Sequence, residues 1–209
     1  MYSKIVANQK KTHKIESRII KNIHMALVES HMIPLGMNAP DFTLIDTISG
    51  ESIHLNNDPS LKATVIVFIC NHCPYVQPIL RKLVEIADHY QNQGVQFYAI
   101  SSNDADHYPA DAPDEMKAHA ERYGFSFPYL YDETQAIAKA YQAECTPDFF
   151  LFDDKFNCIY RGRFDASRPG NTIPVTGSDL VEAIQRCLER KPIIAVQYPS
   201  IGCSIKWKK

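Results

Sequence analysis

The hydrophobic pattern changes its period several times along the chain. Residues 41–46 and 51–55 are short alternating runs on either side of Thr-Ile-Ser-Gly, which predicts an antiparallel hairpin. Residues 63–69, Ala-Thr-Val-Ile-Val-Phe-Ile, are apolar without alternation and rich in β-branched side chains. Because a strand that is covered on both faces needs no polar side, this run predicts a central strand.

Helical spacing follows the central strand. Apolar residues recur every three or four positions from Val76 to Ala87, so we expect a helix from just after Cys73 to about Gln91. Further helices are predicted over 114–123, 133–143 and 178–190, and further strands over 95–101, 148–152 and 158–164. This order predicts an α/β fold with a central mixed β-sheet flanked by helices, and the hairpin is an N-terminal extension of that sheet.

The same pattern divides the chain into a body and two flanking segments. Residues 34–192 form one predicted domain, because no linker-like composition interrupts them. Residues 1–33 are an N-terminal extension, either a mobile arm or a segment with a short helix around 15–23 that docks on the body, and Met25 is an alternative start. Residues 193–209 form a C-terminal tail.

Composition and charge narrow the class of protein. The chain is 45% hydrophobic and 22% charged with a formal net charge of -2, which gives no general attraction to nucleic acid or acidic membranes. The apolar stretch 63–70 is much shorter than the roughly 20 residues that cross a bilayer. Residues 1–24 lack the apolar core of a secretory signal. We therefore expect a cytoplasmic protein whose six cysteines stay mostly reduced.

Two cysteines, Cys70 and Cys73, stand where the central strand gives way to the predicted helix. The free amide groups and the positive dipole end of a helix start favour a thiolate at the first cysteine. We therefore expect Cys70 to attack a substrate disulfide and Cys73 to resolve the mixed disulfide that results. His72, when protonated, would place a second positive charge beside the thiolate and stabilise the reduced pair.

These residues resemble a thioredoxin-like active site, with a hydrophobic strand, Cys-Asn-His-Cys, and Pro78 five positions after the second cysteine. Residues 145–152, Cys-Thr-Pro-Asp-Phe-Phe-Leu-Phe, are similar to the cis-proline segment of the same superfamily. The resemblance implies a thioredoxin-like fold, and it implies that Thr146 and Pro147 face the dithiol and align an extended thiol-bearing substrate.

Residues 36–44, Gly-Met-Asn-Ala-Pro-Asp-Phe-Thr-Leu, resemble the opening of the redoxin (AhpC/TSA-related) branch, which includes the peroxiredoxins and related reductases. The end of the chain, Pro-Ser-Ile-Gly-Cys-Ser-Ile-Lys-Trp-Lys, is similar to a group of cytosolic thioredoxin-family proteins. This chain departs from thioredoxins at Ile69 and Thr64, which stand where a Trp and a buried Asp are usual. Water or a carboxylate such as Glu144 must then accept the proton of Cys73.

The pattern predicts a thiol-disulfide oxidoreductase and leaves two alternatives. Its substrates would be proteins or low-molecular-weight thiols and disulfides, a cellular dithiol would donate the electrons, and no bound cofactor or metal is expected. The first alternative is an antioxidant peroxidase that forms a sulfenic acid at Cys70, although the Pro-x-x-x-Thr-x-x-Cys loop of peroxiredoxins is absent. The second is a metal-binding or redox-sensing protein without turnover, because Cys-x-x-Cys is also half of a zinc site. The pattern does not predict an oligomeric state.

The other cysteines have different expected environments. Cys145, two residues before Pro147, is a candidate to face the active site and to act there as a third redox cysteine. Cys203 lies in the tail, where we expect an exposed thiol that is either a third redox cysteine or an uninvolved one. Cys158 and Cys187 are expected to be structural.

Two groups of charged residues each allow an ordinary and a functional interpretation. The first group, near the end of the last predicted strand, consists of Arg161, Arg163, Asp165 and Arg168. We expect a solvated ion-pair cluster there, with binding of an anionic substrate as the alternative. The second group consists of Asp104, Asp106 and His107. Turn chemistry explains this group, and metal ligation is the alternative.

Overall fold

The structure is a computed structural model that describes residues 27–55 and 58–209. The predictions for residues 1–24 and the alternative start at Met25 lie outside the described residues. The strands are β1 (Leu27–Glu29), β2 (Thr43–Asp46), β3 (Ser52–His54), β4 (Ala63–Phe68), β5 (Val95–Ser101), β6 (Tyr129–Tyr131), β7 (Cys145–Thr146), β8 (Asp148–Asp153), β9 (Cys158–Gly162) and β10 (Ile201–Ser204). The helices are α2 (Leu80–Gln91), α3 (Pro113–Tyr123), α4 (Ala136–Ala140) and α5 (Ser178–Leu188), with 3-10 turns at Gln77–Ile79 and Pro109–Asp111.

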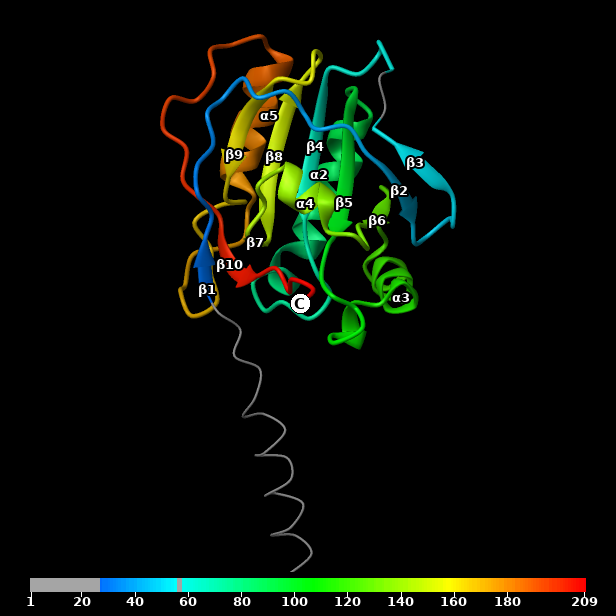
Figure 1. Cartoon of the computed structure of the whole chain (residues 1–209). Helices are drawn as coiled ribbons and strands as arrows, with labels where there is room; N and C mark the ends of the chain where they lie inside the picture. The colour runs from blue at the N-terminus through cyan, green and yellow to red at the C-terminus, as the bar shows by residue number, and fades with distance from the viewer. Residues whose placement is uncertain (1–26, 56–57) are drawn as a thin grey trace, which may run out of the picture.

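A seven-stranded mixed sheet of order β3-β2-β6-β5-β4-β8-β9 forms the centre of the described part (Figure 1). Strand β4 runs parallel to β5 and antiparallel to β8, and all of its residues are buried. At one edge, β2 and β3 pair antiparallel with Ile45 opposite Ser52. The predicted central strand, the mixed sheet and the hairpin extension are therefore confirmed.

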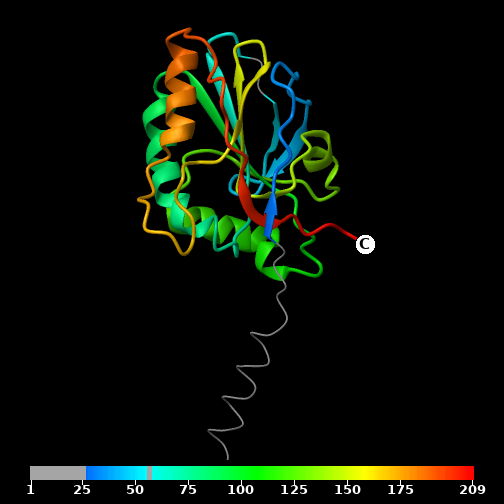
Figure 2. The same cartoon turned by 90° about the vertical axis from the view of Figure 1, so that its left-hand side faces the viewer.

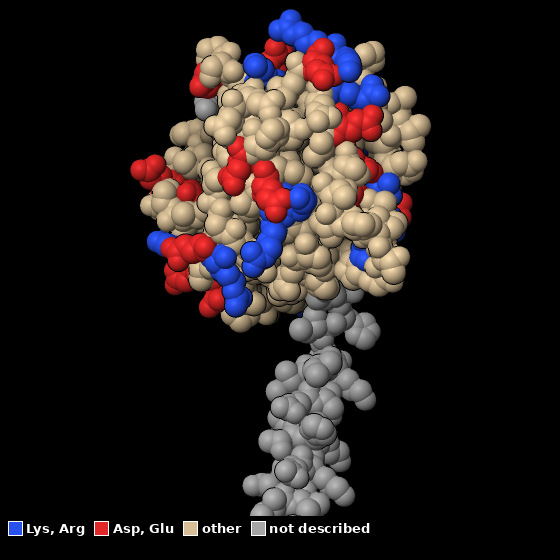
Figure 3. Space-filling model, turned by 180° about the vertical axis from the view of Figure 1, so that it is seen from behind, with Lys and Arg blue, Asp and Glu red and all other residues tan. Residues whose placement is uncertain are grey.

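Helices cover both faces of this sheet. Because successive strand residues point to opposite faces, Val65 and Val67 of β4 pack in one apolar cluster with α2 and α5. Ile66 and Phe68 pack in a second cluster with Ala138 of α4. Figure 2 shows α2 and α5 side by side against one face and the short α4 on the other. Acidic and basic side chains are interspersed on the face seen in Figure 3.

The helix boundaries differ from the predictions in two places. Helix α2 begins at Leu80, and the chain from Cys73 passes through turns and a 3-10 segment first. Pro74 and Pro78 have no backbone N–H, so they withhold donors from a regular first turn. Helix α4 is shorter than 133–143, and it begins after Gln135, whose φ is 62°. Within the described ranges, no helix is both long and apolar enough to span a bilayer.

A second, three-stranded sheet has the order β1-β10-β7. Its strand β7 leads through Pro147 into the start of β8. Its strands are antiparallel, and Cys203 of β10 lies opposite both Leu27 of β1 and Thr146 of β7. The expectation that Cys203 is an exposed thiol of a tail is wrong, because β10 lies between two strands and Cys203 is only 3% exposed. The boundaries of the predicted domain at 34 and 192 stay a prediction.

Candidate active site

The two cysteines of the Cys-x-x-Cys motif lie on the turn that follows β4. Ile69 continues the strand by donating its N–H to the carbonyl of Ile100, and the chain then turns through Asn71. Cys70 is 2% exposed and Cys73 is fully buried. Both cysteines are free thiols, and each shifts the pKa of the other. The turn thus presents a reduced dithiol whose two thiols influence each other's ionisation.

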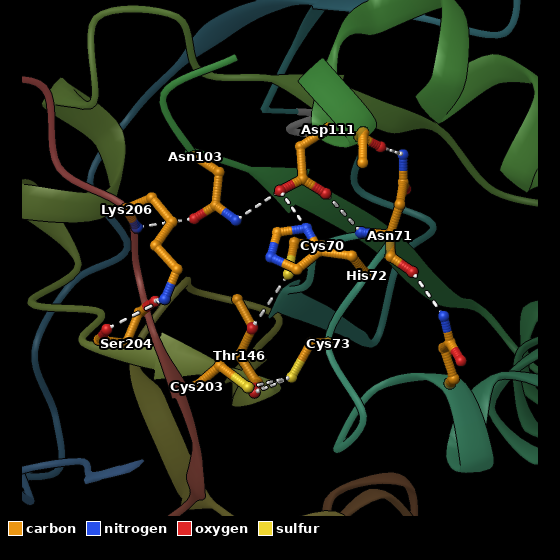
Figure 4. A network of polar contacts seen from close by, with 12 residues as sticks. Cys70, Asn71, His72, Cys73, Asn103, Asp111, Thr146, Cys203, Ser204 and Lys206 are labelled. Atoms are coloured by element: carbon orange, nitrogen blue, oxygen red, sulfur yellow. Dashed lines mark hydrogen bonds and ion pairs between the residues drawn. The ribbon is translucent and has the colours of Figure 1, made fainter. Parts of the chain in front are cut away.

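The cis-proline segment faces this dithiol from the start of β8. The Thr146–Pro147 peptide bond is cis, as the resemblance implied. The Oγ1 atom of Thr146 lies 3.4 Å from the Cys70 sulfur, and its carbonyl oxygen lies 3.1 Å from the Cys73 sulfur (Figure 4). The backbone of Thr146 also pairs with β10, so it is already occupied. The role of Thr146 and Pro147 in aligning a substrate stays a prediction.

The structure brings one of the two candidate third cysteines to the dithiol. The Sγ atom of Cys203 lies 3.0 Å from that of Cys73. Cys145 is adjacent to Thr146 and therefore points to the opposite side of β7, where its thiol donates to the carbonyl of Pro147 at 3.7 Å. Burial raises the pKa of the Cys145 thiol. The site therefore contains three neighbouring sulfurs, those of Cys70, Cys73 and Cys203.

The three thiols shift one another's pKa values. The Cys73 thiol donates to Cys203 and to the carbonyl of Thr146, and its contact with Cys203 and the neighbouring Cys70 lower its pKa, although burial acts in the opposite direction. The neighbouring Cys73 raises the pKa of Cys70 well above its ordinary value, and burial and the charge of Asp111 add to this rise. These directions run against the expectation that the reduced protein carries the thiolate on Cys70, which stays a prediction. The dipole of α2 does not reach Cys70, because the helix begins only at Leu80.

Asp111 is a site residue that the sequence did not reveal. Its buried carboxylate accepts the N–H of Asn71 at 2.8 Å and the side-chain amide of Asn103 at 2.7 Å. Its Oδ2 atom also lies 2.8 Å from Nδ1 of His72, an ion-pair distance. A charge on His72 would thus be balanced first by Asp111. The only sequence signal was a loop rich in Asp, and nothing in it distinguished Asp111 from its neighbours.

Cys70, His72 and Asp111 together form a group that could hold a metal ion. One ligand atom each from Cys70, His72 and Asp111 lie within 4.8 Å of one another. Thiolate, imidazole and carboxylate are all ligands that zinc accepts. The group Asp104, Asp106 and His107, by contrast, follows the predicted turn chemistry. Asp104 accepts the N–H of Asp106 at 3.2 Å and lies 2.6 Å from Nδ1 of His107.

Glu144 is not placed to serve as the proton acceptor of Cys73. Its carboxylate accepts the N–H of His31 at 2.7 Å and lies 2.9 Å from Nδ1 of the same residue. Within the described residues, Glu144 makes no hydrogen bond to Cys73. The other acceptor that the sequence left open, a water molecule, stays a prediction.

The cluster of charged residues after β9 is not the solvated group that we expected. Arg161 is fully buried and pairs with the buried Asp148 at 3.1 Å. Asp165 is also buried, and its carboxylate accepts the backbone N–H groups of Thr176 and Gly177. Arg163 and Arg168 match the expectation, because Arg163 has a partly exposed ion pair to Asp179 at 2.7 Å and Arg168 is exposed. Binding of an anionic substrate by this cluster stays a prediction.

Comparisons with known proteins agree with this geometry. A solved structure of an uncharacterized conserved protein from Geobacillus kaustophilus is 54% identical, covers 89% of this chain and 98% of its own, and has a TM-score of 0.86. The thioredoxin domain of a thiol-disulfide oxidoreductase from Bacteroides vulgatus is 17% identical with a TM-score of 0.56, and it covers 73% of this chain and 99% of its own. The thioredoxin-like fold is thereby confirmed.

Two further matches concern sequence. The thiol-disulfide oxidoreductase ResA of Geobacillus thermodenitrificans is 29% identical over 128 residues, which are 60% of this chain and 67% of that protein. The model of the AhpC/TSA family matches residues 35–161, more than half of the chain. This match includes the opening segment, both cysteines of the motif and the cis-proline. The chain therefore belongs to the AhpC/TSA family.

Proposed function

We propose that this thiol-disulfide oxidoreductase works by cycling Cys70 and Cys73 between a dithiol and a disulfide. The observation that carries the proposal is that Thr146 contacts both sulfurs, with its Oγ1 atom 3.4 Å from Cys70 and its carbonyl oxygen 3.1 Å from Cys73. The enzyme class agrees with the names of the curated ResA relatives. Proteins or low-molecular-weight disulfides would be the substrates, and a cellular dithiol would restore the reduced pair.

The charge distribution suggests the order of proton transfers. The pKa of Cys73 is lowered and that of Cys70 is raised, so Cys73 would carry the negative charge of the reduced site. Cys73 takes the proton of Cys70 while Cys70 attacks one sulfur of the substrate, and the other substrate sulfur leaves as a thiolate. Cys73 then attacks the Cys70 sulfur, and the second substrate sulfur leaves with the proton. The two electrons that reduce the substrate come from the thiols of Cys70 and Cys73, which are oxidised to a disulfide.

His72 and Asp111 would control the first of these steps. The charge of Asp111 raises the pKa of Cys70, which keeps this thiol protonated until a substrate arrives. His72 lies 2.8 Å from the same carboxylate, so protonation of its ring would weaken that influence. Both residues therefore act as positioning groups that set when Cys70 becomes a nucleophile.

An insulin disulfide-reduction assay tests the proposal. The Cys70→Ser and Cys73→Ser variants should each reduce turnover to the uncatalysed background, because neither can close the internal disulfide. Cys187→Ser is the matched control, since this thiol lies on α5 and contacts the carbonyl of Lys62. Wild-type turnover in either of the first two variants would rule out the proposed pair. The peroxidase alternative stays a prediction, and the same variants with a hydroperoxide test it.

Metal binding is a second candidate because of the three ligand atoms contributed by Cys70, His72 and Asp111. The metal content of the protein as purified separates the two functions. One zinc per chain that is lost in both Cys70→Ser and Asp111→Asn, together with no turnover of insulin, would favour the metal site. Turnover by zinc-free protein would favour disulfide exchange.

A further inference from the structure

The chain's own C-terminal strand occupies the edge that the sequence assigned to a substrate. Strand β10 pairs antiparallel with β7, with Cys203 opposite Thr146 and Ser204 opposite Cys145. On its other side β10 pairs with β1, where Val28 lies opposite Gly202. A thiol-bearing extended strand thus already lies beside the dithiol, and Cys203 is the residue that faces the cis-proline segment (Figure 4).

Gly202 makes this close approach possible. A Cβ atom added at Gly202 would lie 2.0 Å from the carbonyl oxygen of Thr146 and 2.7 Å from its carbonyl carbon. These are backbone atoms of β7, so they cannot rotate away as the end of a flexible side chain would. Any residue with a Cβ would therefore push β10 away from β7 and move the following cysteine with it.

The ends of β10 are held by hydrogen bonds to the body of the protein. On the N-terminal side, the hydroxyl of Ser200 donates to the carbonyl of Gly162 at 2.7 Å. On the C-terminal side, the N–H of Lys206 donates to the Asn103 side chain at 2.8 Å, and its carbonyl accepts from Gln135 at 2.8 Å. These bonds fix the position of the Cys203 sulfur along the strand.

The sulfurs of Cys73 and Cys203 are close to bonding distance. They lie 3.0 Å apart, while a disulfide is about 2.05 Å long, so about an ångström of movement would join them. Both residues are buried, which limits access of solvent to the pair. Cys73 is also the second cysteine of the Cys-x-x-Cys motif, so its sulfur is the one shared by the proposed Cys70–Cys73 and Cys73–Cys203 disulfides.

We propose that Cys203 is a third exchanging thiol and that β10 holds it as an internal substrate of the dithiol. The inference rests on the proposed function, because it starts from the Cys70–Cys73 disulfide which that reaction leaves. Cys203 attacks the Cys73 sulfur, the Cys73–Cys203 bond forms, the Cys70–Cys73 bond breaks, and the proton of Cys203 passes to the released Cys70 sulfur. No electrons enter or leave in this step, and the protein retains one disulfide while Cys70 is free again.

Disulfide mapping of cysteine variants tests the inference. Cys70→Ser is incubated with oxidised glutathione, remaining thiols are blocked in acid, and peptides are identified by mass spectrometry. The Cys73 thiolate attacks glutathione disulfide and releases one glutathione, and Cys203 then attacks Cys73 and releases the second. We expect a Cys73–Cys203 disulfide in Cys70→Ser and in a Cys70→Ser/Cys187→Ser control. A glutathione that remains on Cys73 while Cys203 stays free would overturn the inference.

The Gly202→Ala substitution in the Cys70→Ser background tests the role of β10 without removing a sulfur. We expect the Cys73–Cys203 disulfide to form at least tenfold more slowly than with Ser204→Ala, which alters the same strand but keeps the close approach. Equal rates would contradict the role of β10. Wild-type protein that turns over insulin but yields no Cys73–Cys203 bond would refute this inference alone. Wild-type protein that neither turns over nor forms the Cys70–Cys73 bond would refute the proposed function.

Discussion

The two sheets of this protein differ in how they are held together. In the seven-stranded sheet, the central strand β4 is buried along its whole length and packs against helices on both faces. In the three-stranded sheet, strands of two to four residues are joined by backbone pairing and anchored by polar contacts such as that between Lys206 and Asn103. The comparison indicates that the large sheet supplies the stability, while the small sheet places sulfur atoms.

Truncating one large side chain in each sheet tests whether the two sheets contribute differently to stability, and it should give the largest effect. Phe150 of β8 is fully buried among aromatic rings, including those of Phe68 and Tyr141. We expect Phe150→Ala to lower the free energy of unfolding by about 3–5 kcal/mol. Leu27 of β1 is 60% exposed, so Leu27→Ala should change it by less than about 0.5 kcal/mol. Urea unfolding measures both, and equal losses would contradict the division of roles.

Asp148 lies where the two sheets meet, directly after Pro147, and it should make stability depend on pH. Burial raises the pKa of this carboxyl from 3.8 to about 6, although Arg161 acts in the opposite direction. A raised pKa means that the folded state is favoured while the carboxyl is protonated, below pH 4, and that this benefit is lost as the pH rises through 6. The shift corresponds to about 3 kcal/mol.

Unfolding measured from pH 4 to pH 7 checks the Asp148 prediction. Relative to Asp148→Asn, the wild type should lose stability as the pH rises across this interval. The quantity compared is the change of the unfolding free energy with pH. Asp148→Asn also leaves Arg161 without its ion-pair partner, and the resulting loss of stability does not depend on pH in this range, so it does not affect the comparison. Parallel pH profiles for the two proteins would show that Asp148 does not titrate in this range.

Asn103 connects the small sheet to the site and should have a smaller effect. Its side-chain amide donates to the Asp111 carboxylate, and its side-chain oxygen accepts the N–H of Lys206. Asn103→Ala therefore removes one hydrogen bond from the Asp111 carboxylate and one from the Lys206 N–H. We expect a loss of about 1–3 kcal/mol. Hydrogen exchange of the β10 amides should accelerate more than that of the β4 amides. Uniform acceleration in both strands would instead point to loss of global stability alone.

The smallest expected effect is spectroscopic and concerns the charge of the Cys73 thiol. Because the contact with Cys203 and the neighbouring Cys70 lower the pKa of Cys73, the reduced protein should show thiolate absorbance at 240 nm below neutral pH. Cys73→Ser should remove this signal, and Cys187→Ser should keep it. A signal that survives in Cys73→Ser would place the thiolate elsewhere.

The sequence predicted the large sheet because its signals are local. The β-branched run of β4 and the helical spacing after Val76 each specify one element without reference to distant residues. Cys70 and Cys73 were found in the same way, by their spacing at the end of a strand. Thr146 was placed beside the dithiol by the resemblance of residues 145–152 to the cis-proline segment of the thioredoxin-like superfamily.

The remaining features depend on contacts between distant parts of the chain. Strand β10 is four residues long, and its place is set by pairing with β1 and β7 rather than by its own composition. Asp111 lies in a loop with other aspartates, and only the fold turns it toward His72. The burial of Arg161 follows from its pairing with Asp148. The start of α2 was misplaced because Pro74 and Pro78 delay its first turn.

Equilibration of the wild-type protein in dithiothreitol redox buffers, followed by thiol counting and peptide mapping, tests the central claim most directly. We predict a single two-electron transition in which every disulfide contains Cys73, joined to Cys70 or to Cys203, while Cys145, Cys158 and Cys187 stay reduced. A protein that loses no thiols across the transition range, or whose disulfide omits Cys73, would contradict the account.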